Sequence, residues 1–253
     1  MAEPAGEQGA GPAGEPSLDV SVVLPAYNEA TRLPPTIRRV AEFLATGGLA
    51  GELIVVDDGS SDGTVAEVTS LAAEGIPLRL LRHEANRGKG AAVRTGMLAA
   101  TGATVLFSDA DLSTPIEEVL KLIDALKQAD VAIGSRAIDR GLVEVHQPWP
   151  REAMGRVFNV IVQAVVLPGL RDTQCGFKAF RLAAARSIFS RMQSDGFDFD
   201  VEVLLRARRS RLRIVEVPVR WRNSPDTRVS AVGDSLRMLR GLFRIRRMVD
   251  RGG

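Results

Sequence analysis

The stretch VLFSDADLSTP, residues 105–115, decides how the fold is read. An apolar run ends at Ser108, and two aspartates that flank Ala110 follow at once. Apolar side chains recur at helical spacing from Ile116 onward, so the stretch predicts a strand, a loop and a helix in succession. Side chains two positions apart on an extended chain point to the same side, so Asp109 and Asp111 can face one pocket together.

Two carboxylates where a buried strand ends have two explanations. They can hold a divalent cation, because Mg²⁺ typically takes one or two protein carboxylates and completes its shell with water and substrate phosphates. Alternatively, Asp109 hydrogen-bonds a turn while Asp111 helps to begin the helix expected at 115–128. The D-x-D spacing is common, and by itself it leaves both explanations open.

The same alternation continues on both sides of this stretch. Periodicity predicts strands at 19–24, 52–58, 78–82, 103–108 and 130–134. It predicts helices between them at 34–46, 64–74, 89–101 and 115–128. This order gives right-handed β-α-β units and an α/β fold whose mostly parallel sheet is covered on both faces.

The alternation weakens after residue 140. A polar loop is followed by predicted helices at 151–166, near 181–192 and at 200–209, a strand at 213–221 and a last helix near 231–249. At the other end, residues 1–17 consist largely of Gly, Pro, Ala and Glu, and we expect a disordered tail. This tail has no basic segment followed by an apolar one, so it is not read as a signal peptide.

Composition restricts the classes of protein. The chain of 253 residues is 45% hydrophobic and 25% charged, as in globular proteins with a buried core, and no apolar run is long enough to span a bilayer. Cys175 is the only cysteine, which excludes a disulfide within the chain and suits a reducing cytoplasm. Residues 206–251 contain 14 arginines and 4 acids, 14 − 4 = +10, against +2 for the whole chain. That excess favours an anionic partner, either nucleic acid or an anionic membrane surface.

Ligands of parallel sheets bind beyond the carboxyl ends of the strands, where two more polar clusters fall, PAYNE (25–29) and DDGSSDGT (57–64). Asp57 should occupy the last buried position of its strand, where its carboxylate can accept the imide N–H of a uracil. Tyr27 can stack on a base or simply pack on the rim. The segment NRGKGAAVRTG (86–96) fits neither a Walker loop nor a dinucleotide fingerprint, which leaves a glycine-rich helix start, bearing Lys89, that suits a diphosphate.

The ordered motifs VVLPAYNE (22–29), VVDDGSSDGT (55–64), NRGKGAAVRTG (86–96), DAD (109–111) and GSR (134–136) resemble those of the family 2 inverting glycosyltransferases, which have the GT-A fold. The later stretches RDTQCGFKAF (171–180), FDFDVEVLLRA (197–207) and VEVPVRW (215–221) are similar to those of the polyprenyl-phosphate members, dolichyl-phosphate glucosyltransferases among them. The resemblance implies a single GT-A domain over 18–253, with a nucleotide-sugar half at 18–136, an acceptor half at 137–230 and an amphipathic helix at 231–249.

The resemblance also implies roles for individual residues. The nucleotide-binding set is Pro25, Ala26, Tyr27, Glu29, Asp57, Asp58, Lys89 and Asp109. The metal-binding pair, for Mg²⁺ or Mn²⁺ on the diphosphate of UDP-glucose, is Asp109 and Asp111. The acceptor-binding set is Arg136, Arg151, Arg156, Gln174 and Lys178. The catalytic set is Asp109, Asp111, Arg136 and Asp172.

The implied reaction transfers glucose from UDP-glucose to a polyprenyl phosphate with inversion. A phosphate monoester is largely dianionic near neutrality, so it can attack without a general base. Its charge must, however, be brought beside a diphosphate, which requires cations on both sides. A GDP-mannose or UDP-N-acetylglucosamine donor, or a soluble acceptor, would preserve this mechanism. A sugar nucleotidyltransferase would usually have a glycine-rich loop with Arg and Lys after the first strand, and PAYNE is not such a loop. A non-catalytic module that binds membrane or nucleic acid would leave the three acidic clusters unexplained.

A lipid acceptor also accounts for the arginine-rich end of the chain. Over 231–249, Val232, Leu236, Leu239 and Phe243 follow one helical stripe, with arginines on another. Such a basic amphipathic helix can lie on an anionic bilayer, or it can dock on the sheet with its arginines in water. We therefore expect a cytoplasmic protein, peripheral on the membrane and without nucleic acid as a partner. The N-terminal anchor of the eukaryotic relatives is not found in this sequence.

Overall fold

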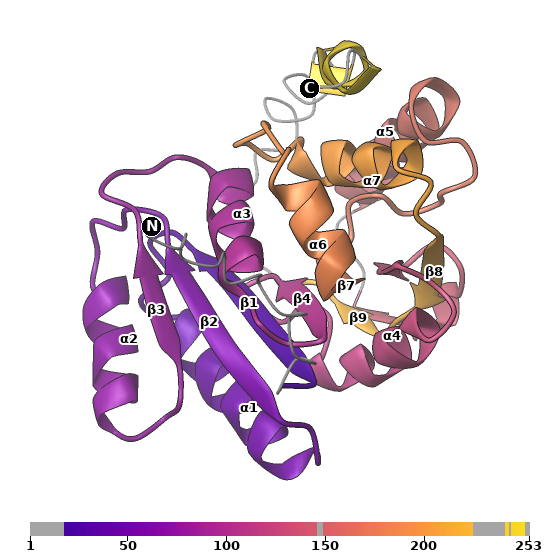
Figure 1. The fold of residues 1–253 in the computed structure, drawn as a ribbon. Coiled ribbons are helices and arrows are strands. Elements are labelled where there is room, and N and C mark those ends of the chain that lie inside the picture. Colours follow the sequence, from indigo (N-terminus) through magenta and orange to yellow (C-terminus); the bar gives the residue numbers. More distant parts are fainter. Residues whose placement is uncertain (1–17, 146–148, 225–240, 243, 251–253) are drawn as a thin grey trace, which may run out of the picture.

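A seven-stranded sheet with helices on both faces forms the body of the computed structural model, which describes residues 18–145, 149–224, 241–242 and 244–250 (Figure 1). The strands of this sheet, in spatial order, are β3 (Arg79–Arg82), β2 (Gly51–Asp57), β1 (Val20–Ala26), β4 (Thr104–Ser108), β7 (Phe177–Arg181), β5 (Val131–Ser135) and β8 (Ile214–Pro218). All neighbouring pairs are parallel except the two that involve β7. The predicted α/β fold with a mostly parallel sheet is confirmed.

The helices lie in two layers. α1 (Leu33–Thr46), α2 (Thr64–Ala73) and α4 (Val119–Leu126) cover one face. The other face is covered by α3 (Lys89–Ala99), α5 (Trp149–Val165), α6 (Leu182–Phe189) and α7 (Phe199–Arg209). The remaining elements are the 3-10 turns η1 (Ile116–Glu118) and η2 (Arg140–Leu142), and the strands β6 (Val143–Val145) and β9 (Trp221–Arg222), which form a separate two-stranded sheet.

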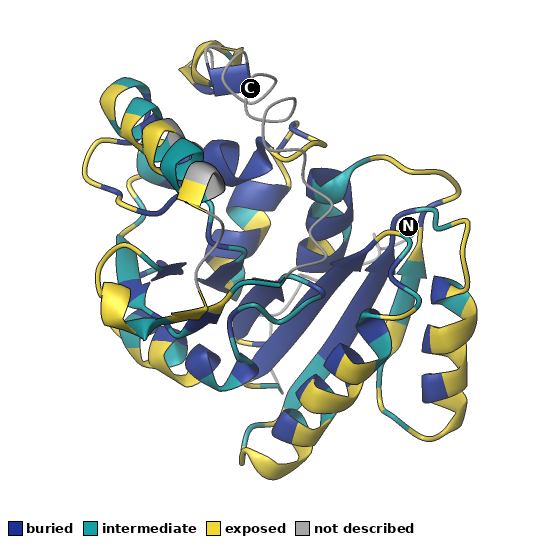
Figure 2. Cartoon of the chain, turned by 180° about the vertical axis from the view of Figure 1, so that it is seen from behind, coloured by how far each residue is buried: buried dark blue, intermediate teal, exposed yellow. Residues whose placement is uncertain are grey.

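Strand β1 shows why the sheet is buried on both sides. Its side chains alternate between the two faces, so Val22 and Leu24 join the cluster under α1, α2 and α4, while Val23 joins the cluster under α3, α6 and α7. The central strands appear as a continuous buried band with exposed residues on the outer faces of the helices (Figure 2). This is the pattern that the near-continuous apolar runs of the sequence predict.

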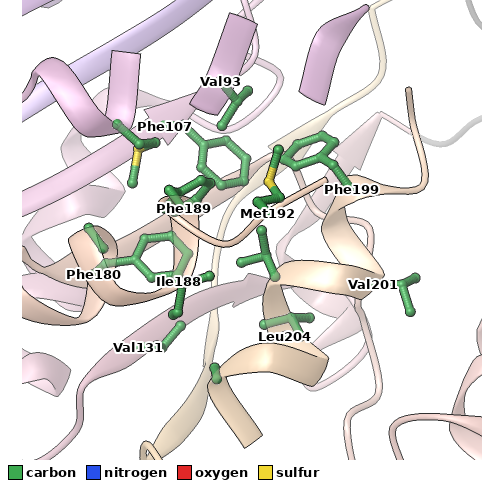
Figure 3. Packing of buried hydrophobic residues seen from close by; sticks show 14 of the residues in the cluster. Val93, Phe107, Val131, Phe180, Ile188, Phe189, Met192, Phe199, Val201 and Leu204 are labelled. Atoms are coloured by element: carbon green, nitrogen blue, oxygen red, sulfur yellow. The ribbon is translucent and has the colours of Figure 1, made fainter. Parts of the chain in front are cut away.

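Aromatic side chains fix the end of β4 that carries the two aspartates. Phe107 stacks on Phe180 of β7 with ring centroids 6.2 Å apart and meets Phe199 of α7 at 5.5 Å. Phe180 in turn meets the edge of Phe189 at 5.3 Å (Figure 3). All four rings are fully buried in the cluster under α3, α6 and α7, so aromatic packing on that face holds the strand that ends one residue before Asp109.

Two elements differ from the sequence-based prediction. The sequence pattern predicts no strand at 177–181, but β7 inserts there antiparallel between β4 and β5, with Ser108 opposite Phe177. The strand predicted at 213–221 ends at Pro218, which has no N–H for further pairing, and the chain continues into β9 of the second sheet. The antiparallel direction of β7 brings its first residue to the rim where the parallel strands end.

The predicted tail at 1–17 and most of the predicted terminal helix at 231–249 lie outside the described residues. Residues 241–242 and 244–250 are helical, and Leu242, Ile245 and Val249 are buried in the same cluster as α5, α6 and α7. The apolar side of this part is therefore docked on the protein, while its arginines are exposed. Within the described ranges, the structure contains no helix with the length and hydrophobicity needed to cross a bilayer.

Candidate active site

The carboxyl ends of β1, β2 and β4 meet at one rim of the sheet, and the predicted polar clusters follow them. Pro25 and Ala26 end β1, Asp57 ends β2, and Asp109 comes directly after β4. The register pairs Ala26 with Asp57, which places the first two clusters next to each other. Gly176 directly precedes β7, and its carbonyl accepts a hydrogen bond from Asp109 N at 3.1 Å.

The PAYNE and DDGSSDGT segments are joined by Asn28. Its Oδ1 accepts from Ser61 N at 2.8 Å and Asp62 N at 3.3 Å, and its own N–H donates to Ser60 Oγ at 2.8 Å. Asn28 adopts a left-handed conformation with φ of 54°, which a residue other than glycine rarely takes without a local hydrogen-bonding reason. Tyr27 beside it remains 40% exposed and so presents its ring at the rim.

The other predicted nucleotide contacts of these two segments are more deeply placed. Asp57 is fully buried and accepts from Ser60 N at 3.3 Å. Glu29 is mostly buried and pairs with Arg32, with Nε and Oε2 2.6 Å apart. The Ser60 turn thus holds the Asp57 carboxylate at the end of β2.

Asp58 is occupied by contacts within the chain. Its Oδ1 lies 2.6 Å from His83 Nδ1 and accepts from Arg87 N at 3.0 Å, while Oδ2 accepts from Gly88 N at 2.8 Å. His83 Nε2 lies 2.9 Å from Thr95 Oγ1. This buried network holds the loop that leads to Lys89, so the geometry gives Asp58 a positioning role and not a contact on the surface of the site.

The start of α3 is not an open phosphate cradle. The amides of Gly90 and Ala91 donate to the carbonyl of Asp195 at 2.8 and 3.3 Å, and the amides of Arg87 and Gly88 belong to the Asp58 network. A helix terminus binds an anion through unpaired N–H groups, and four of the five amides at 87–91, all but that of Lys89, donate to these acceptors. A diphosphate at the helix start stays a prediction, and the Lys89 side chain, which is 24% exposed, is the group that can supply its countercharge.

Asp109, Asp111 and Lys89 form the electrostatic centre of the rim. Lys89 Nζ lies 2.5 Å from Asp109 Oδ1, and Asp111 Oδ1 accepts from Ser113 N at 2.9 Å. Burial and the neighbouring Asp109 charge raise the pKa of Asp111, whereas the acidic neighbours of Lys89 outweigh its burial and raise the lysine pKa. Two carboxylates that repel each other and share one lysine fit an added divalent cation, and their oxygens are the ligand type that Mg²⁺ and Mn²⁺ prefer.

The chain supplies two carboxylates here and not a complete cage. Within the described ranges there is no cluster of three or more His, Cys, Asp or Glu residues suited to a metal. A cation between Asp109 and Asp111 would therefore take its remaining ligands from water and phosphate oxygens, as is usual for Mg²⁺. The turn after the pair is strained, with Leu112 at φ 44°, and backbone strain of this kind tends to occur at functional sites.

A buried layer of alternating charges lies beneath Lys89. Lys178 is fully buried, and its Nζ donates to Asp200 Oδ1 at 2.5 Å and to the carbonyl of Cys175 at 2.6 Å. The structure thus places Lys178 under the site, where it cannot reach an acceptor at the surface. Burial raises the pKa of Asp200, although Lys178 and Lys89 both oppose this.

The sequence-based site lacked Asp200. The segment FDFDVE (197–202) indicates such a residue. It places Asp200 in the first turn of a mostly apolar helix, and a buried acid there needs a cation as partner. Asp200 links the two lysines, and so it connects the α7 segment to the rim.

Arg136 and Asp172 form the second charged centre. Arg136 Nε and Nη2 donate to Oδ2 and Oδ1 of Asp172 at 2.7 and 2.8 Å, and the Arg136 amide adds a third bond at 3.0 Å. The Arg136 side chain remains 27% exposed and stacks on Trp221, 5.4 Å from the ring centroid. Asp172 therefore orients the guanidinium, and in the described part of the chain nothing accepts from its Nη1 group.

The other predicted acceptor residues are placed differently. Gln174 is half-buried, and its backbone N–H donates to Asp172 Oδ1 at 3.3 Å. Arg156 is exposed on α5 and pairs with Glu152 at 2.8 Å. The side chain of Arg151 lies outside the described part of the structure. Of the predicted acceptor set, the structure brings Arg136 and Gln174 together, and it leaves Arg156 on the outer surface.

Comparison with known proteins agrees with these motifs. Residues 21–189 match the family model described as glycosyl transferase family 2. A dolichyl-phosphate beta-glucosyltransferase of Drosophila melanogaster is 38% identical over 244 residues, covering 91% of this chain and 75% of that protein. The protein of the same name from Saccharomyces cerevisiae is 35% identical over 247 residues, covering 90% and 74%.

Solved structures show the same fold. Glucosyl-3-phosphoglycerate synthase from Mycobacterium tuberculosis, in complex with UDP, superimposes with a TM-score of 0.68 at 20% identity, covering 90% of this chain and 80% of that one. A complex of that synthase with Mn²⁺, UDP-glucose and phosphoglyceric acid gives a TM-score of 0.62 at 21% identity, covering 90% and 78%. The similarity confirms the predicted GT-A architecture.

Proposed function

This chain belongs to glycosyltransferase family 2, and from that premise we propose that it transfers glucose from UDP-glucose to a polyprenyl phosphate, with inversion, at the rim formed by Asp109, Asp111, Lys89 and Arg136. The observation that carries the proposal is the presence of two separate charged centres at one sheet edge. One is an acidic pair with a lysine. The other is an arginine fixed by a buried aspartate.

The first centre suits a nucleotide diphosphate. Asp109 and Asp111 would hold Mg²⁺ or Mn²⁺, which when bound neutralises phosphate oxygens and favours departure of the diphosphate. Lys89 is poised beside them, 24% exposed, and its ammonium can contact a phosphate oxygen directly. Tyr27 presents an exposed ring at the adjacent loop, where it can stack on a base. The Mn²⁺ and UDP-glucose named for the structural neighbour are compatible with this assignment.

The second centre suits a phosphate acceptor. Arg136 stays ionised because Asp172 outweighs the effect of burial and raises the arginine pKa. With Nε and Nη2 held by Asp172, the guanidinium plane is fixed and Nη1 is left for an acceptor oxygen. A dianionic phosphate positioned in this way can attack without losing a proton to the enzyme. The names of the relatives, dolichyl-phosphate beta-glucosyltransferases, support a lipid phosphate as acceptor.

The test is a matrix of donors and acceptors. UDP-glucose, UDP-N-acetylglucosamine and GDP-mannose are each incubated with Mn²⁺ and with a short polyprenyl phosphate, a soluble sugar-acid phosphate or a simple alcohol, and nucleoside diphosphate release is measured. We expect rapid UDP release only from UDP-glucose with polyprenyl phosphate, and a β-linked product by NMR. Turnover that is equal with the alcohol, or unaffected by removal of metal with chelator, contradicts the proposal.

A matched pair of variants separates the acceptor centre from the donor centre. Arg136→Lys retains the charge but loses the bidentate geometry, so we expect the KM for the acceptor to rise with little change in the Kd for UDP. Arg38→Lys serves as control and should change neither quantity, because Arg38 is an exposed residue of α1 that pairs with Glu74 at the end of α2. An Arg136→Lys enzyme with an unchanged acceptor KM would remove Arg136 from the acceptor site.

A further inference from the structure

Helix α5 carries an apolar stripe on its outer side along its whole length. Trp149, Val157 and Val160 are 80%, 61% and 62% exposed, and Ala153 and Ala164 continue the same line at helical spacing. The opposite side of the helix packs on the core through Val162. Figure 2 shows α5 at the periphery of the molecule with exposed residues along it. An outward stripe of this kind, on a helix that already has a buried face, marks an interaction surface.

Arginines lie on α5 and near its C-terminal end. Arg156 lies beside Val157 on α5, and Arg246 of the terminal helical residues donates to the carbonyl of Val165 at 2.9 Å. Arg247 is exposed, Arg244 is exposed but pairs with Asp198 at 3.0 Å, and the buried residues of this terminal segment belong to the same cluster as Val162. The described arginines of the C-terminal sequence therefore lie near the C-terminal end of α5, where Arg246 contacts Val165.

The same helix contacts the acceptor centre. Asn159 Oδ1 accepts from Thr173 N at 3.3 Å and from Thr173 Oγ1 at 3.0 Å, and Thr173 directly follows Asp172, the partner of Arg136. One side of α5 thus supports the segment that orients Arg136, and another side presents Val157 and Val160 outward. A lipid that brought its phosphate to Arg136 would lie in a bilayer close to α5.

We infer that α5 docks on an anionic bilayer, with Trp149, Val157 and Val160 in the headgroup–acyl boundary and the neighbouring arginines on lipid phosphates. An interfacial tryptophan, an apolar stripe and flanking basic residues are the features of helices that lie in a membrane surface. This inference rests on the proposed lipid acceptor, and it assigns the apolar contact to α5 and not to the terminal helix.

Binding to vesicles tests the inference without any reaction. Phosphatidylcholine vesicles with and without phosphatidylglycerol are titrated while intrinsic fluorescence is followed, since Trp149 is exposed and Trp221 is buried. We expect a blue shift and protection from acrylamide on anionic vesicles, weakened by salt. The Trp149→Phe variant should bind with a much smaller blue shift. Two results would overturn the inference and assign the stripe to protein contacts. One is Trp149 emission that is already protected from acrylamide without vesicles. The other is a dimer in sedimentation that Val157→Asp dissociates.

Variants locate the surface. Val157→Asp with Val160→Asp should lower vesicle affinity at least tenfold, while Leu120→Asp on α4, which is 48% exposed away from α5, should leave it unchanged. Circular dichroism and thermal melting check that all three proteins are folded. Equal loss in the two variants would mean that any added acid weakens binding, and the α5 assignment would fail.

Assays with a short, water-soluble polyprenyl phosphate distinguish this inference from the proposed function. If the wild-type protein binds vesicles through α5 but transfers no glucose, the docking surface stands and the proposed reaction falls. If it transfers glucose in solution but does not bind vesicles, the reaction stands and the docking surface falls. The Val157→Asp, Val160→Asp protein should retain turnover in solution and lose it selectively on vesicle-borne acceptor.

Discussion

Gly176 lies directly against the carboxylate of Asp109: a Cβ on Gly176 would come within 2.0 Å of Asp109 Oδ2 and 2.3 Å of its Cγ. The two residues are also joined by the hydrogen bond from Asp109 N to the Gly176 carbonyl. The side chain that is proposed to hold the metal thus occupies space that exists only because residue 176 has no side chain.

Gly176→Ala should therefore turn the Asp109 carboxylate away from its present position. We expect Mn²⁺ affinity in the presence of UDP to fall and kcat/KM to drop about a hundredfold, since a displacement of about 1 Å at a catalytic group costs that much. Isothermal titration with Mn²⁺ and UDP measures the first effect. Gly155→Ala is the control, because a Cβ there meets nothing within 4 Å and should stabilise α5 by about 1 kcal/mol or less. Unchanged Mn²⁺ binding in Gly176→Ala would refute the assigned role of Asp109.

Asp111→Asn should separate activity from stability. Burial and the neighbouring charge of Asp109 both disfavour the ionised Asp111, and the substitution removes this unfavourable ionised group. The metal-free variant should therefore melt a few degrees above the wild-type protein. Transfer activity should be lost, and added Mn²⁺ with UDP should raise Tm in the wild-type protein only. Asp124→Asn, at an exposed pair with Lys127, should behave as wild type in all three measurements. An Asp111→Asn protein that remains active contradicts the metal assignment.

Asp172→Asn tests the fixed arginine through pH. Although burial opposes the charge, Arg136 keeps the pKa of Asp172 below its ordinary value of 3.8. An acid with a depressed native pKa stabilises the fold fully above the ordinary value, and that contribution is lost as pH falls through the native pKa. Urea unfolding should therefore show Asp172→Asn less stable by about 3 kcal/mol at pH 7, with the difference shrinking below pH 3.8.

The control for this series is Glu42→Gln, at an exposed pair with Arg39 on α1, for which we expect a difference within about 0.5 kcal/mol at every pH. A destabilisation by Asp172→Asn that stays constant from neutral to acid pH would mean that its carboxylate charge is not what stabilises the fold.

Asp58→Asn should loosen the loop that carries Lys89. The two carboxylate oxygens of Asp58 together contact the Arg87 and Gly88 amides and the His83 ring. An asparagine has only one acceptor oxygen, so it cannot keep all three hydrogen bonds. We expect faster hydrogen exchange at the 86–90 amides and a raised KM for UDP-glucose. Glu84→Gln, exposed at the start of the same loop, should change neither. Unaltered exchange in Asp58→Asn would show that the loop is held by other contacts.

Cys175 should be chemically inert in the folded protein. Burial raises the pKa of its thiol to about 11, so at pH 8 it is protonated as well as inaccessible. Iodoacetamide should label the unfolded chain in urea and leave the native protein unlabelled by mass spectrometry. Cys175→Ala should retain turnover, whereas complete loss of turnover in a folded variant would reopen a nucleophilic role.

The sequence by itself determined the strand–helix alternation and the polar clusters at the strand ends. Buried strands, turn residues and helix faces are local patterns, and the carboxyl ends of parallel strands must share one rim. Asp57 at the last buried position of β2 and Asp109 directly after β4 therefore stand where local reasoning placed them.

Only the tertiary structure decided what lies behind and beside those clusters. The insertion of β7 between β4 and β5 brings Gly176 against Asp109, and it buries Lys178 against Asp200. A short strand that is buried on both faces has no distinctive period, and its partners are far away in the sequence. Which face of α5 turns outward depended in the same way on the elements beneath it. The pairing of β7 and the outward face of α5 depend on how much apolar surface the whole folded chain buries, and no short stretch of sequence determines that.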